Sequence, residues 1–280
     1  MLDFKLSKMR KMITTGKNFW GVDVEFLQED VKETTGVASY DPFFDRVEFH
    51  LKWIEKIAKE FPQIIDDEID FAVLHELGHA KEARIYEEKG LFPYSRNILT
   101  DIPPGEISEV FNIVDTFFDG IEDYKVEKKL FENGFLKPLT WFQQALPNME
   151  QVLKKPGCEV LGRDTAFMNL PLSMCSYKFC SLSNAQKRVI KSYYLKFLGK
   201  RLWEEMVETI DTLEFGKVNT TVEVASALIH DFFGWTVTLG SIRRKDLELI
   251  VKEQHKFAGG FMLPSFWRKN NYSYYSIQVT

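Results

Sequence analysis

DEIDFAVLHELGHAKEARIYEEK, residues 67–89, combines an apolar stripe with the motif HELGH. The apolar residues recur at helical spacing, which predicts a helix that packs into the core. They are Ile69, Ala72, Val73, Leu77 and Ala80. In such a helix His75 and His79 lie one turn apart on the same face. The stretch therefore predicts a core helix that presents two imidazoles to one point.

Two neutral imidazoles at this spacing can bind one Zn²⁺ and leave room for a third protein ligand and a water. Glu76 can take the proton of that water, because the metal lowers the water's pKa from about 15.7 toward roughly 7. H-E-x-x-H is the signature of zinc metallopeptidases. The alternative is a helical interaction protein that binds no metal, in which the motif is accidental. Metal analysis separates the two.

Residues 106–133 predict a second amphipathic helix with a clear buried face. Its apolar positions are Val110, Ile113, Val114, Phe117, Ile121 and Tyr124. Its other positions are strongly acidic, and they include Asp115, Asp119, Glu122, Asp123 and Glu127. No histidine follows His79 at close spacing, since Ile85 stands six residues on. An acid of this helix is therefore the expected third ligand.

The choice of acid depends on helical geometry. Glu122 lies about 100° from the centre of the apolar face, where a partly desolvated carboxylate would favour a cation. We therefore predict Glu122 as the ligand, with Asp123 as the alternative. Asp123 and Glu127, four residues apart, could instead orient His75 or His79 as second-shell residues. A solvated acidic face remains open as well.

Residues 46–53, RVEFHLKW, alternate between apolar and polar positions and predict a half-buried edge strand. A peptide substrate could bind by adding to such an edge. Residues 19–28 predict a further strand. Residues 1–18 are a basic arm or a first helix.

Most of residues 135–280 read as helices separated by loops. We expect a loop region at 157–171, one long helix or two stacked helices at 184–213 with a break near Gly199, and helices at 220–239 and 243–257.

Further residues are candidates to stabilise the transition state. His230 lies in an apolar helix, where it could contact an oxyanion or be a satisfied core residue. His50, on the expected edge strand, could face the site. Four other possible donors are Tyr40, Tyr94, Arg84 and Arg96, and the sequence does not rank them.

Composition limits the function classes. A net charge of −5 argues against general nucleic-acid binding. No run of 18 uncharged apolar residues and no signal peptide is present, so we expect a soluble, cytoplasmic protein without membrane contact. The three cysteines, Cys158, Cys175 and Cys180, predict free thiols in a reducing compartment.

HELGH, followed by Ile121-Glu122-Asp123 and by Val126-Glu127, resembles the zincin metallopeptidases. The similarity is greatest to the gluzincins, and in particular to the minimal gluzincins. The turn at 40–42 and the strand at 46–51 also resemble theirs. The resemblance implies that His75, His79 and Glu122 hold zinc and that Glu76 is the general base.

The chain departs from the thermolysin-type Asn-Glu-x-x-x-Asp helix, because Val126 stands four residues after Glu122. That departure keeps Asp123 open as the ligand, with Glu127 as its partner. The resemblance covers residues 40–133 and does not account for residues 135–280.

The expected fold is α+β and helix-dominated. Residues 1–134 would form a zincin-like lobe with a small mixed sheet, and residues 135–280 a helical lobe of unknown role packed on the first. We expect a zinc metallopeptidase with one Zn²⁺ per chain and a peptide or protein substrate. The alternative is a zincin-fold binding or regulatory protein without general protease activity.

Overall fold

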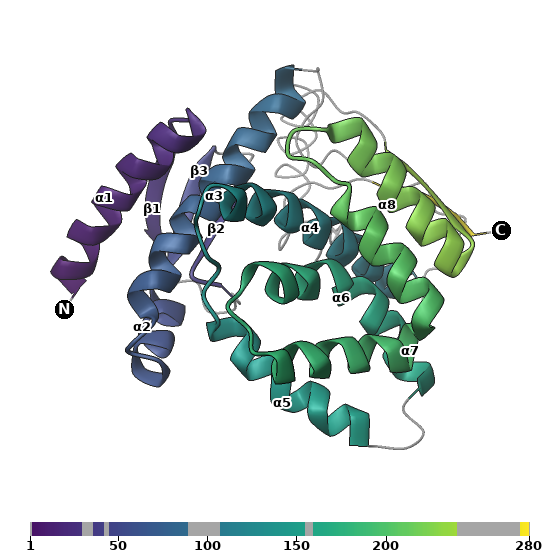
Figure 1. Cartoon of the computed structure of the whole chain (residues 1–280). Coiled ribbons are helices and arrows are strands. Elements are labelled where there is room, and N and C mark those ends of the chain that lie inside the picture. Colours follow the sequence, from purple (N-terminus) through teal and green to yellow (C-terminus); the bar gives the residue numbers. More distant parts are fainter. Residues whose placement is uncertain are drawn as a thin grey trace, which may run out of the picture.

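The computed structural model describes residues 2–29, 36–41, 45–88, 107–154, 159–239 and 275–279. Its helices are α1 (Leu2–Trp20), α2 (Leu51–Glu60), α3 (Ile65–Glu88), α4 (Ile107–Glu132), α5 (Thr140–Lys154), α6 (Glu159–Phe179), α7 (Asn184–Asp211) and α8 (Val218–Phe233). Its strands are β1 (Glu25–Glu29), β2 (Ala38–Asp41), β3 (Arg46–His50), β4 (Trp235–Leu239) and β5 (Tyr275–Val279). The expected helix at 243–257, and the residues Tyr94, Arg96 and Cys158, lie outside the described ranges. The fold is α+β and helix-dominated, as expected (Figure 1).

The three-stranded sheet has the order β1-β3-β2, with β3 parallel to β1 and antiparallel to β2. The prediction that residues 46–53 form an edge strand is therefore wrong. β3 is the central strand, it ends at His50, and α2 begins at Leu51. Its alternation was a correct sign of a half-buried strand, with Val47 and Phe49 buried. β3 is paired on one side by β1, which lies within and just after the strand predicted at 19–28. On the other side it is paired by β2, which was not predicted as a strand.

α3 confirms the helix expected around HELGH, and its apolar stripe is buried except for the half-buried Ala72. The first turn of α3 contains three acids, Asp66, Asp67 and Glu68, whose negative charges interact favourably with the positive end of the helix dipole. α1 packs along α3, where the Trp20 indole donates a 2.7 Å hydrogen bond to the Leu74 carbonyl. The basic N-terminal segment is thus a helix that supports α3.

α4 belongs to two hydrophobic cores. Val126 and Leu130 pack with α1, α2, α3 and the three-stranded sheet, while Phe117 and Ile121 pack with α6, α7 and α8. In Figure 1 α4 accordingly lies between the purple and blue elements and the green helices. α4 thus contributes to both cores. The lobe boundary expected at residue 134 lies just after the end of this helix.

The loop expected at 157–171 is wrong, since α6 runs from Glu159 to Phe179. Gly162 and Pro171 have low helix propensity, but both lie at helix packing contacts. Gly162 lies under the Phe197 ring, and a Cβ at Gly120 of α4 would lie 3.1 Å from Cβ of Pro171. Tertiary contacts therefore outweigh the local preference against helix.

The later helices follow the sequence more closely. α7 has a kink at Gly199 (φ 78°), which confirms the predicted break. α8 ends at Gly234 in the left-handed conformation (φ 74°), so the helix expected at 220–239 is too long at its C-terminal end. The residues beyond it form β4, which pairs with β5.

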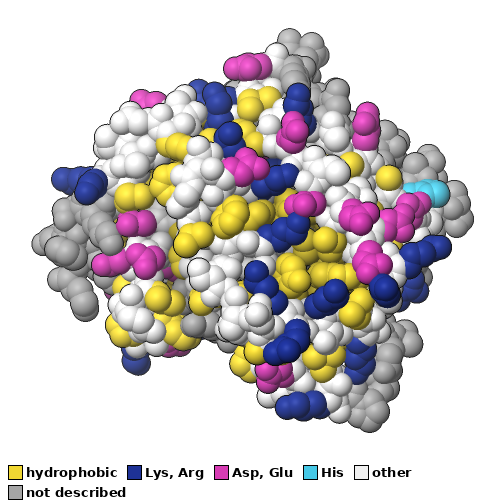
Figure 2. Space-filling model, in the orientation of Figure 1, with side chains coloured by type: hydrophobic (Ala, Val, Ile, Leu, Met, Phe, Trp, Pro, Cys, Tyr) yellow, Lys and Arg dark blue, Asp and Glu magenta, His cyan; other side chains and the backbone are white. Residues whose placement is uncertain are grey.

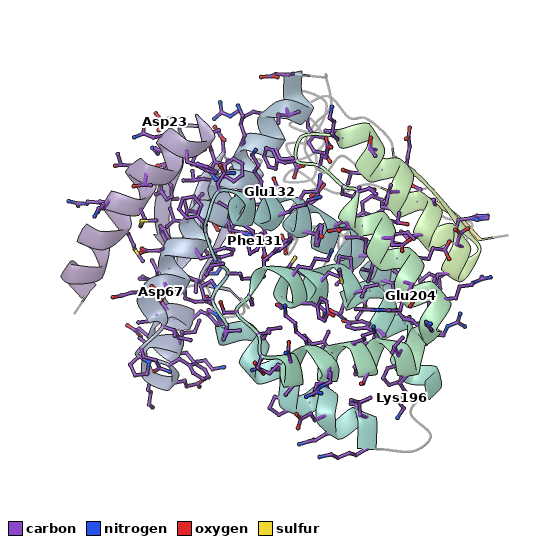
Figure 3. The ribbon with its side chains drawn as sticks, viewed as in Figure 1. Asp23, Asp67, Phe131, Glu132, Lys196 and Glu204 are labelled. Carbon is purple, nitrogen blue, oxygen red and sulfur yellow. The ribbon has the colours of Figure 1, made fainter. Side chains whose placement is uncertain are left out.

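On the face shown in Figure 2, basic and acidic side chains are mixed around a central apolar area. Phe131, 41% exposed, and Leu136, 57% exposed, are the large apolar residues described as exposed. Figure 3 places Phe131 beside Glu132 at the end of α4. Within the described ranges, no helix has both the length and the apolar character needed to cross a bilayer.

Candidate metal centre

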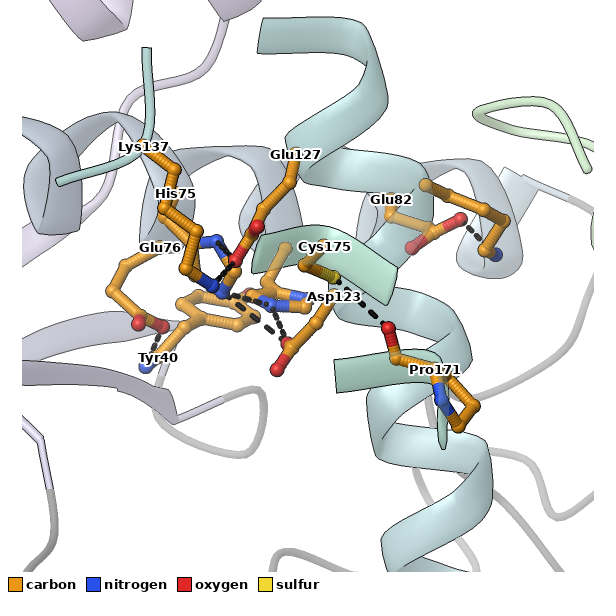
Figure 4. Close-up of polar contacts among 11 residues, drawn as sticks. Tyr40, His75, Glu76, Glu82, Asp123, Glu127, Lys137, Pro171 and Cys175 are labelled. Atoms are coloured by element: carbon orange, nitrogen blue, oxygen red, sulfur yellow. Dashed lines mark hydrogen bonds and ion pairs between the residues drawn. The ribbon is translucent and has the colours of Figure 1, made fainter. Parts of the chain in front are cut away.

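Three side-chain donor atoms converge between α3 and α4 (Figure 4). Nε2 of His75 and Nε2 of His79 are 3.0 Å apart. Oδ1 of Asp123 lies 3.2 Å from the first nitrogen and 2.9 Å from the second. The helical spacing of the motif thus brings both imidazoles to one point, and α4 supplies the carboxylate. We refer to His75, His79 and Asp123 as the triad.

The triad fits a zinc ion in donor type and in spacing. Two ligands that are each about 2.0 Å from a tetrahedral Zn²⁺ lie about 3.3 Å from one another. The observed separations of 2.9–3.2 Å are close to this value. Two imidazoles and one carboxylate also form a donor set that suits zinc. Among the described residues no fourth metal-ligating side chain joins the group.

Of the two acids that the sequence left open as the third ligand, Asp123 and not Glu122 lies in the described group of donor atoms. The Glu122 carboxylate is buried and accepts a 3.1 Å hydrogen bond from the Tyr86 hydroxyl. The reason is that α4 is covered on several sides at this level, with Ile121, Tyr124 and Val126 all fully buried. The angle between an acid of α4 and the centre of the predicted apolar face therefore does not tell which acid is buried at the site.

The triad is coupled electrostatically. Burial lowers the pKa of His79, but the hydrogen bond and charge of Asp123 outweigh this and raise the pKa to about 10. Burial raises the pKa of Asp123, but His75 and His79 outweigh this and hold that pKa below its ordinary value. A metal ion would replace the proton that this arrangement otherwise attracts, so metal and proton compete for the triad.

Glu76 lies beside the imidazoles on the side where β2 passes (Figure 4). Its Oε2 accepts a 2.7 Å hydrogen bond from the backbone N–H of Tyr40. Burial raises the pKa of Glu76 above its ordinary value, although His75 and His79 act against the shift. The motif glutamate is therefore held by the sheet at the edge of the triad, as a base for a nearby water requires.

Glu127 lies behind His75. Its Oε1 is 3.6 Å from Nδ1 of His75, and it also pairs with Nζ of Lys137. Of the two acids expected to orient the histidines, Glu127 thus lies next to the His75 ring, whereas Asp123 belongs to the triad itself.

The sequence did not identify two basic residues near the site. Lys125 of α4 is fully buried and pairs with Glu82 of α3, and Lys137 pairs with Glu127. Glu82, the partner of Lys125, could have been found from the sequence, because it follows His79 by three residues on the same helix face. Lys137 comes after the end of α4, and no local pattern marks it.

The other candidates for transition-state stabilisation do not join the triad. The His230 side chain is 61% exposed on α8, next to Asp231. His50 is buried, with Nδ1 at 2.8 Å from the Gly36 carbonyl and Nε2 at 3.1 Å from the Ser39 hydroxyl.

Two of the unranked donors, Tyr40 and Arg84, hydrogen-bond to Asp45. The other two, Tyr94 and Arg96, are in the segment 89–106 that is not described.

Cys175 and Cys180 are free and buried, as predicted for thiols outside a disulfide framework. Burial raises the pKa of Cys180 to about 12, so this thiol stays protonated at neutral pH. Neither cysteine belongs to the described metal-ligating group.

Comparisons of the chain with protein-family models, with curated proteins and with solved structures find no match.

Proposed function

We propose that the chain is a zinc-dependent metallopeptidase that hydrolyses peptide bonds with Glu76 as general base. The observation that supports this most strongly is the convergence of His75, His79 and Asp123, with Glu76 beside them. The similarity of HELGH and of the following acidic helix to zincins points in the same direction. Asp123 takes the place that the resemblance gave to Glu122.

The residues of the site would divide the work as follows. His75, His79 and Asp123 hold one Zn²⁺, which when bound acts as a Lewis acid and brings the pKa of a water toward roughly 7. Glu76 accepts the proton of the attacking water and later delivers it to the leaving amine. The Tyr40 N–H fixes one carboxylate oxygen of Glu76 and leaves the other for the water. Burial brings the pKa of Glu76 closer to neutrality, which suits a residue that must both take and return a proton.

The substrate would lie along β2 and not along β3. β3 is paired on both sides, so its backbone groups are occupied by the sheet. β2 is an edge of the described sheet, and the Tyr40 N–H bonds Glu76. The edge of β2 opposite β3 therefore faces the base, and a peptide that extended the sheet there would pass the triad.

The test uses zinc-loaded protein and a mixture of unrelated peptides, with the products identified by mass spectrometry. We expect cleavage by the wild type, and a loss of about 10²-fold or more in Glu76→Gln with zinc content unchanged. Glu122→Gln is the matched control, since it also neutralises one acid near the site but leaves the base and the triad intact. Cleavage by Glu76→Gln at the wild-type rate would refute the proposed role of Glu76. Bound zinc without cleavage of any peptide would favour the binding or regulatory protein instead.

A further inference from the structure

A line of contacts leads from the triad to the residues that follow α4. Nδ1 of His75 is 3.6 Å from Oε1 of Glu127, and the same oxygen pairs with Nζ of Lys137. Neither Nδ1 of His75 nor Oε2 of Glu127 has a hydrogen-bond partner among the described residues. Closing the 3.6 Å gap between Oε1 of Glu127 and Nδ1 of His75 would give this buried nitrogen its acceptor.

The chemistry of a metal-bound imidazole requires such a partner. When His75 binds a metal through Nε2, its proton is on Nδ1, and that N–H needs an acceptor that fixes the ring. In the described structure Glu127 is the carboxylate next to Nδ1. The orientation of the His75 ring therefore depends on where the Glu127 carboxylate stands.

Glu127 in turn needs a cation, because its side chain is only 2% exposed and a buried unpaired carboxylate is costly. Lys137 supplies the positive charge from a side chain that is 16% exposed. Burial lowers the pKa of Lys137, but the charge of Glu127 outweighs this and raises that pKa above its ordinary value. Lys137 is thus charged at neutral pH, and it attracts Oε1 of Glu127, the oxygen that lies near Nδ1 of His75.

The position of Lys137 is set by the helical part of the molecule. Its backbone N–H donates a 3.4 Å hydrogen bond to the Phe179 carbonyl at the end of α6, and it forms an isolated β-bridge with Cys180. The Cys180 thiol donates to the Pro138 carbonyl at 3.6 Å. The C-terminal end of α6 therefore fixes the backbone from which the lysine reaches Glu127.

We propose that Lys137 is a positioning residue for the metal ligand His75 and acts through Glu127. This inference rests on the metal site of the proposed function, and it gives the helical part of the chain a role there. Lys137 holds the Glu127 carboxylate at Nδ1, and the carboxylate holds the imidazole with Nε2 directed at the metal.

The experiment measures Zn²⁺ affinity by competition with a chromophoric chelator, and the visible absorption of the Co²⁺-substituted protein. The variants are Lys137→Met, Lys137→Arg and the control Lys128→Met. Lys128 also comes from the α4 region and donates to the carbonyls of Asp211 and Leu213, but it does not contact Glu127. Thermal unfolding of the metal-free proteins shows whether each variant is folded.

We expect Lys137→Met to bind Zn²⁺ about 10- to 100-fold more weakly and to alter the Co²⁺ spectrum. Lys137→Arg should recover most of the affinity, and Lys128→Met should bind as the wild type does. A purely electrostatic role predicts the opposite sign, since removing a positive charge near a cation site tightens binding. Tighter or unchanged binding in Lys137→Met would therefore overturn the proposal.

If Lys137→Met unfolds, the same substitution is tested in a protein that already contains Glu127→Gln. Glu127→Gln removes the buried charge that requires the lysine, so Lys137→Met should have no further effect on Zn²⁺ affinity in that background. An additional loss there would contradict an action through Glu127. Failure of the wild type to bind Zn²⁺ at all would be a different result, because it would remove the metal site and not only the role of Lys137.

Discussion

α4 packs against α6 on one side and against α3 on the other, and the two interfaces differ in chemistry. The α6 side is apolar and aromatic. Phe117 stacks on Phe167 with ring centroids 4.4 Å apart, and Tyr124 packs on Phe179 with centroids 5.2 Å apart. This interface belongs to the larger of the two cores, which α7 and α8 complete.

The α3 side contains a row of buried or half-buried polar residues, which we call the polar seam. Its members are His75, His79, Glu82 and Tyr86 of α3 with Glu122, Asp123, Lys125 and Glu127 of α4. Removing a charge from water costs several kcal/mol per ion, so such a seam is weak evidence for stability. Perturbed, buried titratable groups cluster at functional sites. The contrast is what we expect if the α6 interface maintains the fold and the triad within the polar seam serves the proposed chemistry.

The largest effect on stability should come from breaking the buried ion pair of the seam. Lys125→Met leaves the Glu82 carboxylate buried without its cation, and we expect a loss of about 3–5 kcal/mol in the free energy of unfolding. The double variant Glu82→Leu/Lys125→Met should recover most of this loss, because it removes both charges. Urea denaturation of the metal-free proteins measures the difference. A double variant as unstable as Lys125→Met alone would contradict the account of the pair.

On the apolar side, a core truncation should separate stability from metal binding. Leu170 of α6 is fully buried, and Leu170→Ala should cost about 3 kcal/mol of unfolding free energy. The Zn²⁺ affinity of this variant should match that of the wild type below the unfolding temperature, because Leu170 belongs to the larger core and is not a member of the seam. Denaturation and chelator competition on the same samples test both statements. A Zn²⁺ affinity that falls with stability would mean that the two interfaces are not separable.

Gly78 offers a way to push α3 and α4 apart. A Cβ there would lie 2.5 Å from Cγ1 of Val126 and 3.0 Å from the Trp20 ring. Gly78→Ala should therefore lower the unfolding free energy by about 1–3 kcal/mol through overpacking, less the gain in helix propensity of about 1 kcal/mol. It should also weaken Zn²⁺ binding, since Asp123 moves away from His79. Val126→Ala in the same chain should restore both properties, and an unchanged affinity in Gly78→Ala would show that the helices can shift without opening the triad.

The smallest effect concerns the pH dependence of stability on the α6 side. Burial raises the pKa of Asp211, but Lys178 and Tyr124 outweigh this and hold it below its ordinary value of 3.8. Such a carboxyl stabilises the fold above the unfolded pKa, and this contribution is lost as the pH falls through the folded pKa. Asp211→Asn should thus be less stable than the wild type at pH 6 and equally stable in strong acid. A constant difference across a pH series of thermal unfolding would contradict this.

The sequence predicted α3, the helix that contains HELGH, better than its surroundings. The spacing of His75, Glu76 and His79 places three functional groups by helix geometry alone, so α3 and its motif could be derived locally. The second helix could be derived in the same way. The choice between Glu122 and Asp123 could not, because α4 has neighbours on two sides and its apolar face points at only one of them.

The remaining misses depend on contacts between residues far apart in the chain. β3 alternates as an edge strand would, but β1 and β2 pair with it from both sides. The loop expected at 157–171 contains Gly162 and Pro171, which lie in α6 and pack against Phe197 and Gly120. Lys137 reaches Glu127 only because the end of α6 holds its backbone.

The zinc content of purified protein, measured by mass spectrometry, tests the central claim most directly. The samples are the wild type, His79→Ala, Asp123→Asn and Glu122→Gln. We predict about one zinc per chain in the wild type and in Glu122→Gln, and a loss of zinc in His79→Ala and Asp123→Asn. Zinc retained in Asp123→Asn but lost in Glu122→Gln would contradict the triad. Wild-type protein without zinc would contradict the metal site altogether.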